Sequence, residues 1–273
     1  MSEFTSIRYD DAGAVVTVTL ARPGSANALD STTIDELDAA LDLIEASQAA
    51  RVVVLAAEGD NFCSGHDLKE IMSAAPPWAS QRSTAEGKLH HEEVMYWDRS
   101  LRWRDFPLPT VAAVQGTCAA AGLMLATMCD LIIAADDARF SNPVLRMSGA
   151  GVELLVEPWE LGARRAKEFL LCARTLDADE AERAGLVNRV VPRPDLAAAT
   201  RQVAEEIALV PTVTARAVKA SINATLDRMG QRDSWRHHFM VHQFVSNTDT
   251  ALNLMRRRTE GGMDAVKREQ RGE

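Results

Sequence analysis

Hydrophobic positions near the start of the chain change period twice, and each change predicts an element. Residues 15–20 (VVTVTL) carry alternating β-branched side chains, which is typical of a β-strand. Apolar residues over 34–44 recur at spacings of three and four, which predicts a helix with one apolar face, and Thr32 and Thr33 offer capping-box chemistry at its start. The continuous apolar run at 51–57 (RVVVLAA) suits a strand covered on both faces. This succession predicts a βαβ unit with a right-handed crossover.

The alternation of strands and helices continues to about residue 195 and then stops. Apolar or small-residue runs predict a strand, a helix and two further strands at 110–116, 119–128, 131–136 and 189–191. Beyond them the pattern is helical, with Val203, Ile207 and Val210 on one face. We therefore expect an α/β fold in which residues 1–195 form the core and residues 196–273 form a helical C-terminal region.

Composition is that of a globular protein and narrows its partners. The 273 residues are 47% hydrophobic, which is enough for a sizeable core in one large domain. The formal net charge of −9 disfavours a polyanionic partner, so no nucleic-acid binding is expected. A small anionic ligand is not excluded by this charge, because it needs only a local positive spot and a few aimed N–H groups.

Cysteine and histidine spacing gives no metal motif. The cysteines at 63, 118, 129 and 172 lack C-x-x-C spacing, so reduced and mostly buried thiols are expected. The histidine pairs at 90–91 and 237–238 have no cysteine pair near them, so no metal site is expected. The polar N-terminus has no signal-peptide pattern, and no apolar run approaches the roughly 20 residues of a membrane span. A cytoplasmic location without a membrane partner is therefore expected.

Residues 74–84 (AAPPWASQRST) are rich in proline and small polar residues, which predicts an exposed, mobile loop. Trp78 within it has two interpretations. Its ring either covers a bound ligand or packs down on the protein surface.

Two glycine-associated turns carry the candidate chemistry. In residues 61–69 (NFCSGHDLK), Gly65 allows a tight turn and Asp67 caps a short helix, so the N–H groups of His66 and Asp67 are expected to point out of a helix N-terminus. Residues 116–122 (GTCAAAG) open a second helix after an apolar strand, with small side chains that allow close approach to the backbone. Each turn alone is weak evidence, but the two together, about 55 residues apart, are much more specific.

The chain resembles the crotonase (enoyl-CoA hydratase/isomerase) superfamily over essentially its whole length. The matching stretches are 22–30 (RPGSANALD), 61–70 (NFCSGHDLKE), 114–143, 175–192 and 262–269 (GMDAVKRE). The resemblance implies a ββα spiral core followed by a helical C-terminal trimerisation region, and assembly as a homotrimer or a dimer of trimers.

The resemblance also implies an oxyanion hole for a coenzyme A thioester. Its donors would be the backbone N–H groups of His66 and Ala121, which would stabilise the negative charge that an enolate places on the thioester oxygen. The coenzyme A moiety would bind to backbone around the first turn, at Ala26, Ala28, Ser64, Gly65, His66 and Leu68. No tightly bound cofactor is implied, because the thioester is itself the substrate or ligand.

At two positions this sequence departs from the family pattern. Where family hydratases carry two acid/base glutamates, this chain has Met124 and Val144, and neither side chain transfers a proton. Glu153 is the tentative replacement, with Glu157 as a weaker candidate. An apolar setting would raise the pKa of Glu153, whereas a surface position or pairing with Arg164 or Arg165 would make it structural.

Other chemistry-bearing residues keep more than one interpretation. The His66 side chain is a further acid/base candidate, Asp130 is expected to be structural, and a Ser64 or Ser141 nucleophile lacks the G-x-S-x-G motif. The basic stretches at 256–258 and 267–268 either meet coenzyme A phosphates or form solvated helix faces. The histidines at 237, 238 and 242 are expected on a helix surface.

Three functions compete on this evidence. We expect an enzyme that polarises an acyl-CoA thioester in hydratase or isomerase chemistry, using an unusual acid such as Glu153. The alternative is a protein that binds acyl-CoA without turning it over, as Met124 and Val144 suggest. A hydrolase using the same oxyanion hole would need a nucleophile that the sequence does not supply.

Overall fold

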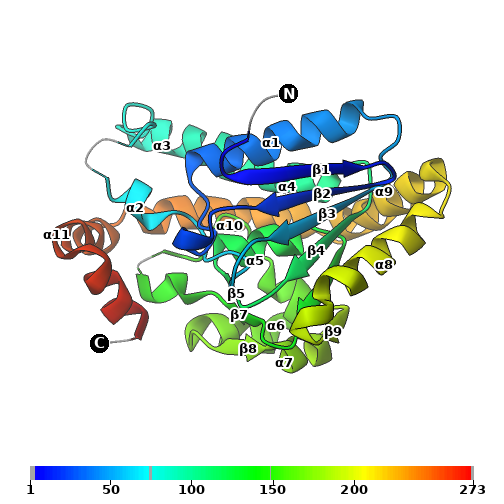
Figure 1. Cartoon of the computed structure of the whole chain (residues 1–273). Coiled ribbons are helices and arrows are strands. Elements are labelled where there is room, and N and C mark those ends of the chain that lie inside the picture. Colours follow the sequence, from blue (N-terminus) through cyan, green and yellow to red (C-terminus); the bar gives the residue numbers. More distant parts are fainter. Residues whose placement is uncertain (1–3, 74–75, 148, 272–273) are drawn as a thin grey trace.

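The computed structural model describes residues 4–73, 76–147 and 149–271 and contains two β-sheets with helices on both sides of the larger one (Figure 1). The larger sheet has the order β1-β2-β3-β4-β6-β9, and only β1 runs antiparallel to its neighbour. Its strands are β1 (Ile7–Ala12), β2 (Val15–Leu20), β3 (Val52–Ala57), β4 (Thr110–Val114), β6 (Leu131–Ala135) and β9 (Arg189–Val191). The smaller sheet contains β5 (Thr117–Ala119), β7 (Arg139–Ser141) and β8 (Thr175–Asp177).

The predicted βαβ unit is confirmed: β2 and β3 are parallel and α1 (Ser31–Ala46) joins them. Along β3, Val53 and Leu55 pack into the main core with α1, whereas Val52 and Val54 pack on the other face with α8 (Leu196–Ala208). This double burial explains why β3 lacks polar residues at alternating positions. The division of the chain at residue 195 remains a prediction, although α8 contributes to the core of the large sheet.

Two local details differ from the expectation. The helix α1 is capped by Asp30, whose carboxylate accepts from Thr33 N at 2.8 Å, so the capping boxes predicted from Thr32 and Thr33 are wrong. The strand β1 was not predicted, because IRYDDA is largely polar and exposed. Pairing with β2 along its whole length and burial of Ile7 in the core hold it in the sheet.

The chain repeats a unit that contains one strand in the larger sheet, one strand in the smaller sheet and then a helix. The first is β4, β5 and α5 (Ala121–Thr127), and the next is β6, β7 and α6 (Glu157–Leu171). These units confirm the ββα spiral core. The residues expected to begin the helix at 119 instead end β5, because Thr117–Ala119 pairs with β7 in the smaller sheet.

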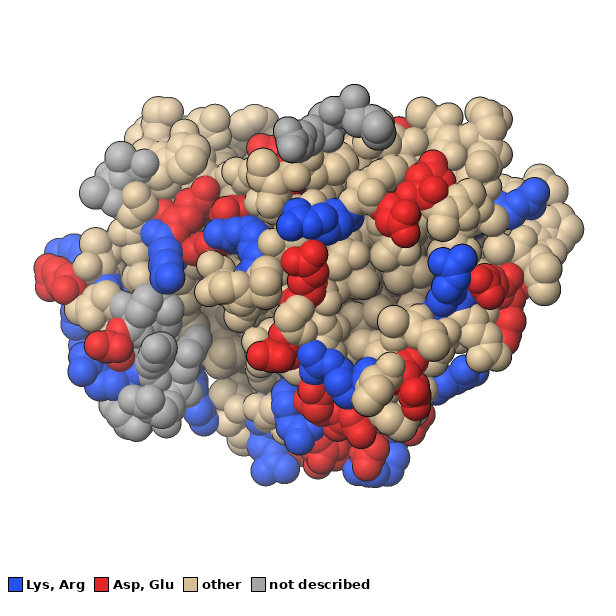
Figure 2. Space-filling model, in the orientation of Figure 1, with Lys and Arg blue, Asp and Glu red and all other residues tan. Residues whose placement is uncertain are grey.

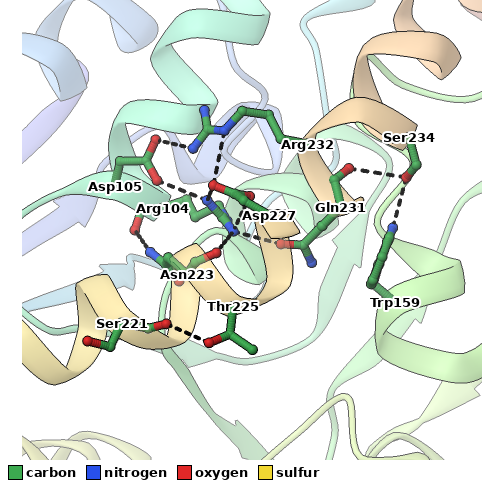
Figure 3. A network of polar contacts seen from close by, with 10 residues as sticks. All are labelled: Arg104, Asp105, Trp159, Ser221, Asn223, Thr225, Asp227, Gln231, Arg232 and Ser234. Atoms are coloured by element: carbon green, nitrogen blue, oxygen red, sulfur yellow. Dashed lines mark hydrogen bonds and ion pairs between the residues drawn. The ribbon is translucent and has the colours of Figure 1, made fainter. Parts of the chain in front are cut away.

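The C-terminal region is helical, as predicted, and contains α9 (Thr212–Arg228), α10 (Gln231–Ser246) and α11 (Asp249–Arg271). A buried cation holds α9 and α10 against α4 (Arg99–Asp105) (Figure 3). The Arg104 guanidinium donates to Asp227 Oδ1 at 2.9 Å, to Gln231 Oε1 at 2.8 Å and to the Asn223 carbonyl at 3.2 Å. It also lies 5.3 Å from the centre of the Trp235 ring.

The surface carries charges of both signs. Figure 2 shows basic and acidic side chains gathered at the bottom of the view, over α6 and α7 (Ala178–Ala184). Within the described part of the chain, no helix is long and apolar enough to span a bilayer. Apolar side chains remain exposed on the C-terminal helices, at Val213, Val218, Ile222, Met240 and Phe244.

Candidate functional site

Backbone hydrogen bonds hold the two glycine-associated turns together. Cys63 and Cys118 form a parallel bridge, in which Cys63 N donates to the Thr117 carbonyl at 3.0 Å and Ala119 N donates to the Cys63 carbonyl at 2.9 Å. Phe62 N donates to the Gln115 carbonyl at 2.7 Å. Segments far apart in the sequence are therefore fixed next to each other by main-chain contacts, which do not depend on particular side chains.

Glycine is required where these turns touch. A Cβ at Gly122 would lie 2.4 Å from the Cys63 carbonyl oxygen, and a Cβ at Gly65 would lie 3.3 Å from Ala121 N. Gly65 also has φ +101°, which a residue with a side chain rarely adopts. Ala120, which precedes α5, adopts φ 50° and ψ −120°. Such strain in a residue other than glycine is characteristic of functional turns.

Two N–H groups at this junction have no acceptor among the residues that the structure describes. Within the described ranges, neither His66 N nor Ala121 N donates to a protein group. Asp67 N donates to the Leu29 carbonyl at 2.9 Å, so the expectation that its N–H also points out of the helix is wrong. His66 and Ala121 line the same cavity, together with Tyr96 and Met124.

The first turn is held by an ion pair and by backbone hydrogen bonds to residues 26–29. The Asp67 carboxylate caps α2 (Leu68–Ile71), as predicted, and forms an ion pair with Arg22 at 3.0 Å. Ser64 N donates to the Ala26 carbonyl at 3.0 Å, and Leu29 N donates to the Gly65 carbonyl at 2.8 Å. The structure therefore brings together the segments that contain the residues expected to bind coenzyme A.

A second cavity of about 530 Å³ opens beside the junction. Ser64, His66, Ala120 and Val144 are among the residues that line it. Trp78 is 8% exposed and forms part of the wall, with the Arg82 guanidinium 4.5 Å from its ring centre. The ring thus packs down on the protein and also faces the cavity. Residues 74 and 75 of the predicted loop lie outside the described residues.

Glu153 lines this cavity and is 3% exposed, so neither a surface position nor pairing with Arg164 or Arg165 applies. Its Oε2 lies 3.2 Å from His66 Nε2. Burial acts to raise the pKa of Glu153, but the charge and hydrogen bond of His66, with the charge of His242, outweigh burial and lower it. The expected upward shift of this pKa is therefore wrong, because the sequence did not show the histidines that face Glu153.

Glu92 forms a second buried carboxylate–histidine pair that the sequence did not reveal. On α3 (Ala85–Glu92), Glu92 accepts from Arg82 at 2.6 Å, lies 3.5 Å from His242 Nε2 and also bonds Gln243. Burial acts to raise the pKa of Glu92, but the hydrogen bond of His242 and the charge of Arg82 hold it at about 2. Burial acts to lower the pKa of His242, but Glu92 raises it.

One atom each of Glu92, Glu153 and His242 lies within 4.8 Å of the others, a spacing that would allow a shared cation. Arg82 already pairs with Glu92, however, and Lys88 lines the same cavity with a second positive charge. We interpret the group as an ion-pair cluster. His238 and His242 are buried, so the expectation that they lie on a helix surface is wrong, while His237 is exposed.

The remaining candidates lie elsewhere or act structurally. Glu157 is 2% exposed and accepts from Asn142 at 2.7 Å, and burial raises its pKa, but it lines neither cavity. Asp130 accepts from Thr110 N at 2.7 Å and pairs with Lys219 at 2.8 Å, which confirms its structural role. Arg258 is buried at the second cavity.

Some predictions on thiols and on the C-terminus are also settled. The cysteines at 63, 118 and 129 are buried and the one at 172 is exposed, and all four are free thiols. Arg256 and Arg257 lie on an exposed helix face. The side chain of Lys267 lies outside the described residues.

Sequence comparison identifies the class of protein that this fold and site define. The family described as "Enoyl-CoA hydratase/isomerase" matches residues 10–260. A putative enoyl-CoA hydratase of Mycobacterium tuberculosis is 38% identical over 256 residues, covering 88% of this chain and 80% of that protein. A probable mitochondrial enoyl-CoA hydratase of Dictyostelium discoideum is 30% identical, covering 90% and 86%.

Solved structures agree with this family. A probable enoyl-CoA hydratase of Mycobacterium thermoresistibile superposes with a TM-score of 0.83 at 42% identity, covering 91% of this chain and 99% of that one. An enoyl-CoA hydratase/isomerase of Xanthobacter autotrophicus gives a TM-score of 0.86 at 28% identity, covering 98% of both. The chain belongs to the enoyl-CoA hydratase/isomerase family of the crotonase superfamily.

Proposed function

We propose that this protein processes acyl-CoA thioesters by hydratase or isomerase chemistry, with the thioester oxygen bound between the N–H groups of His66 and Ala121. The observation that carries the proposal is that these two N–H groups have no acceptor among the described residues and that His66 and Ala121 line the same cavity. Two fixed donors stabilise negative charge that develops on a carbonyl oxygen, by about 2.7–4 kcal/mol each in comparable sites. Backbone at Ala26, Ala28, Ser64, Gly65 and Leu68 would hold the coenzyme A moiety.

The apolar side chains Met124 and Val144 face the two cavities, one in each. Neither supplies a proton, so the acid/base group must come from another residue. Family membership and the names of the relatives support acyl-CoA as the substrate class. Acyl-CoA binding without turnover is the competing outcome.

The proposal is tested with matched ligands. Butyryl-CoA and the thioether butyl-CoA differ only in the carbonyl, so we expect the thioether to bind at least about tenfold more weakly, measured by calorimetry. Incubation with enoyl-CoAs of different chain lengths, followed by mass spectrometry and chromatography, then separates hydration from isomerisation. Equal affinity for both ligands would contradict the oxyanion hole, and thioester binding without any product would favour the binding protein.

A variant tests the junction itself. Gly122→Ala places a methyl group 2.4 Å from the Cys63 carbonyl and should displace the start of α5, whereas Gly24→Ala adds a methyl group with nothing within 4 Å. We expect the first variant to lose the preference for the thioester and the second to keep it. Circular dichroism and thermal unfolding show whether each variant is folded.

We also propose assembly as a homotrimer or a dimer of trimers in the cytoplasm. The apolar side chains exposed on α9 and α10 support an assembly surface there. Light scattering of the protein and of Phe244→Glu tests this, since a charge at a 73% exposed apolar position should weaken assembly without unfolding the chain. A monomeric wild-type protein would contradict it.

A further inference from the structure

The backbone and the side chain of His66 have different surroundings. The backbone N–H lies at the junction of the two turns, while Nε2 of the ring lies 3.2 Å from Glu153 Oε2. The ring packs on Tyr96, with ring centres 4.1 Å apart, and it lines both cavities. A carboxylate on one side and an aromatic ring on its face leave the imidazole little freedom to rotate.

The other ring nitrogen has no hydrogen-bond partner in the described part of the chain. His66 Nδ1 is buried and forms no hydrogen bond within residues 4–73, 76–147 and 149–271. In the uncharged imidazole the hydrogen lies on Nε2, because the Glu153 carboxylate only accepts, and Nδ1 then keeps a lone pair. A buried nitrogen without a partner is unfavourable in a purely structural histidine and is expected where a ligand supplies the missing group.

Glu153 is held as a carboxylate by its surroundings. It faces His66 on one side and the Glu92–His242 pair on the other, and its pKa is lowered although it is buried. Lys88 also lines the cavity and Arg82 neutralises Glu92. A carboxylate with a low pKa is a poor proton carrier near neutral pH, but it orients a histidine well.

We propose that the His66 imidazole is the acid/base group of this site, with Nδ1 as the proton-carrying atom and Glu153 as a positioning residue. The inference rests on the proposed function, because the thioester must be bound by the N–H groups of His66 and Ala121. One residue then supplies an oxyanion donor from its backbone and a base from its side chain. This role replaces the two glutamates whose places Met124 and Val144 take.

The proton balance requires no other reactant. Nδ1 accepts a proton as the C–H bond at the α-carbon of the thioester breaks, and the bonding electrons move onto the thioester oxygen. The two backbone N–H groups stabilise that enolate. The Nδ1–H group then returns the proton to the α-carbon, which is simple exchange. When the substrate is a 3-enoyl thioester, the enolate is conjugated with the double bond, and return of the proton to the γ-carbon moves that double bond to the 2-position.

Exchange with solvent tests the proposal without requiring a complete reaction. Butyryl-CoA is incubated with protein in deuterium oxide, and deuterium entering the α-carbon is followed by mass spectrometry. We expect His66→Gln, which keeps the backbone N–H, to slow exchange by about 100-fold or more while butyryl-CoA affinity stays within about threefold. Glu153→Gln keeps a polar partner but loses the charge, so we expect a loss of about tenfold and a changed pH–rate profile.

Additivity separates positioning from direct proton transfer. Because Glu153 acts through His66, the double variant should be no slower than His66→Gln alone. Glu157→Gln is the matched control, since it makes the same change in a buried glutamate that lines neither cavity. We expect it to exchange at the wild-type rate.

The outcomes that overturn the proposal are distinct. If His66→Gln exchanges as fast as wild type, or if Glu153→Gln is the slower single variant, the imidazole is not the base. If wild type binds the ligand but exchanges no proton, the inference also fails, whereas the oxyanion hole stands. If wild type does not bind butyryl-CoA, the proposed function fails with it.

Discussion

Two buried polar clusters hold the helix α10 to the core, and they differ in whether all their buried nitrogen and oxygen atoms have hydrogen-bond partners. Around Arg104, the guanidinium is shared among Asp227, Gln231 and the Asn223 carbonyl (Figure 3), and no buried side-chain nitrogen or oxygen of that cluster lacks a partner among the described residues. The second cluster contains Glu92, Glu153, His66, His242 and Gln243. Three of its buried atoms have no hydrogen-bond partner among the described residues: His66 Nδ1, His242 Nδ1 and Gln243 Oε1.

The difference separates a network whose hydrogen bonds are complete from one that still has unpaired polar atoms among the described residues. A closed network fixes the position of helices and has no capacity for a further group. An incomplete network beside a cavity of about 530 Å³ leaves hydrogen-bonding atoms where a substrate or water completes them. Burial and charge alone would not distinguish the two clusters, since both contain ion pairs deep in the protein.

The largest expected effect is on the free energy of unfolding, when the Arg104 guanidinium is removed from its hydrogen-bond network. Arg104→Ala leaves Asp227 and Gln231 without their buried partner, and we expect a loss of about 4 kcal/mol in the free energy of unfolding. Acyl-CoA affinity of the folded protein should be unchanged. Urea unfolding and calorimetry measure the two quantities.

The control lies in the same network. The Arg232 side chain is 38% exposed, so Arg232→Ala should lose less than about 1 kcal/mol. A similar loss in both variants would contradict the claim that the buried member holds the helices.

A smaller, pH-dependent effect is expected from Glu92. Its folded-state pKa of about 2 lies below the ordinary value of 4.5, so its stabilisation is complete above pH 4.5 and is lost as pH falls towards 2. The pKa of His242 is raised above 6.5, so that contribution is complete below pH 6.5 and declines as pH rises through the raised value. We expect Glu92→Gln to lose about 3 kcal/mol at most, and the largest difference from wild type between these limits.

Unfolding curves of wild type and Glu92→Gln across this pH range check the prediction. Glu36→Gln serves as a comparison. The pKa of Glu36 is also lowered, and its carboxylate accepts from Thr5 N and Ser6 N, but this side chain is far more exposed than that of Glu92. A difference between wild type and Glu92→Gln that does not change with pH would argue against an ionised Glu92–His242 pair.

The smallest effect is expected from Trp78. Its Nε1 is buried without a partner among the described residues, so Trp78→Phe removes no protein hydrogen bond and should change the free energy of unfolding by less than about 1 kcal/mol. Thermal unfolding without ligand measures this. A loss of several kcal/mol would mean that packing of the larger ring under Arg82 dominates.

The fold was more predictable than the site. Apolar residues at spacings of three and four identified α1, and continuous apolar runs identified β3, β4 and β6, which are buried on both sides. It missed β1, which backbone pairing stabilises. The two turns were identified from their glycines, since Gly65 and Gly122 are required by contacts that leave no room for a side chain.

The electrostatic surroundings of the site were not predictable. Glu153 was singled out from its apolar neighbours in sequence, yet its partners His66 and His242 are 87 and 89 positions away. Its pKa is therefore lowered, not raised. Glu92 gave no sequence signal, because only the packing of α3 against α10 brings it to His242.

The oxyanion donors proposed at residues 66 and 121 belong to the main chain, and the bridge between Cys63 and Cys118 that positions them is also main chain. Under the proposed mechanism, a substitution at position 66 changes the side chain that carries the proton and leaves the backbone donor in place. A single codon change would then alter turnover while thioester binding persists.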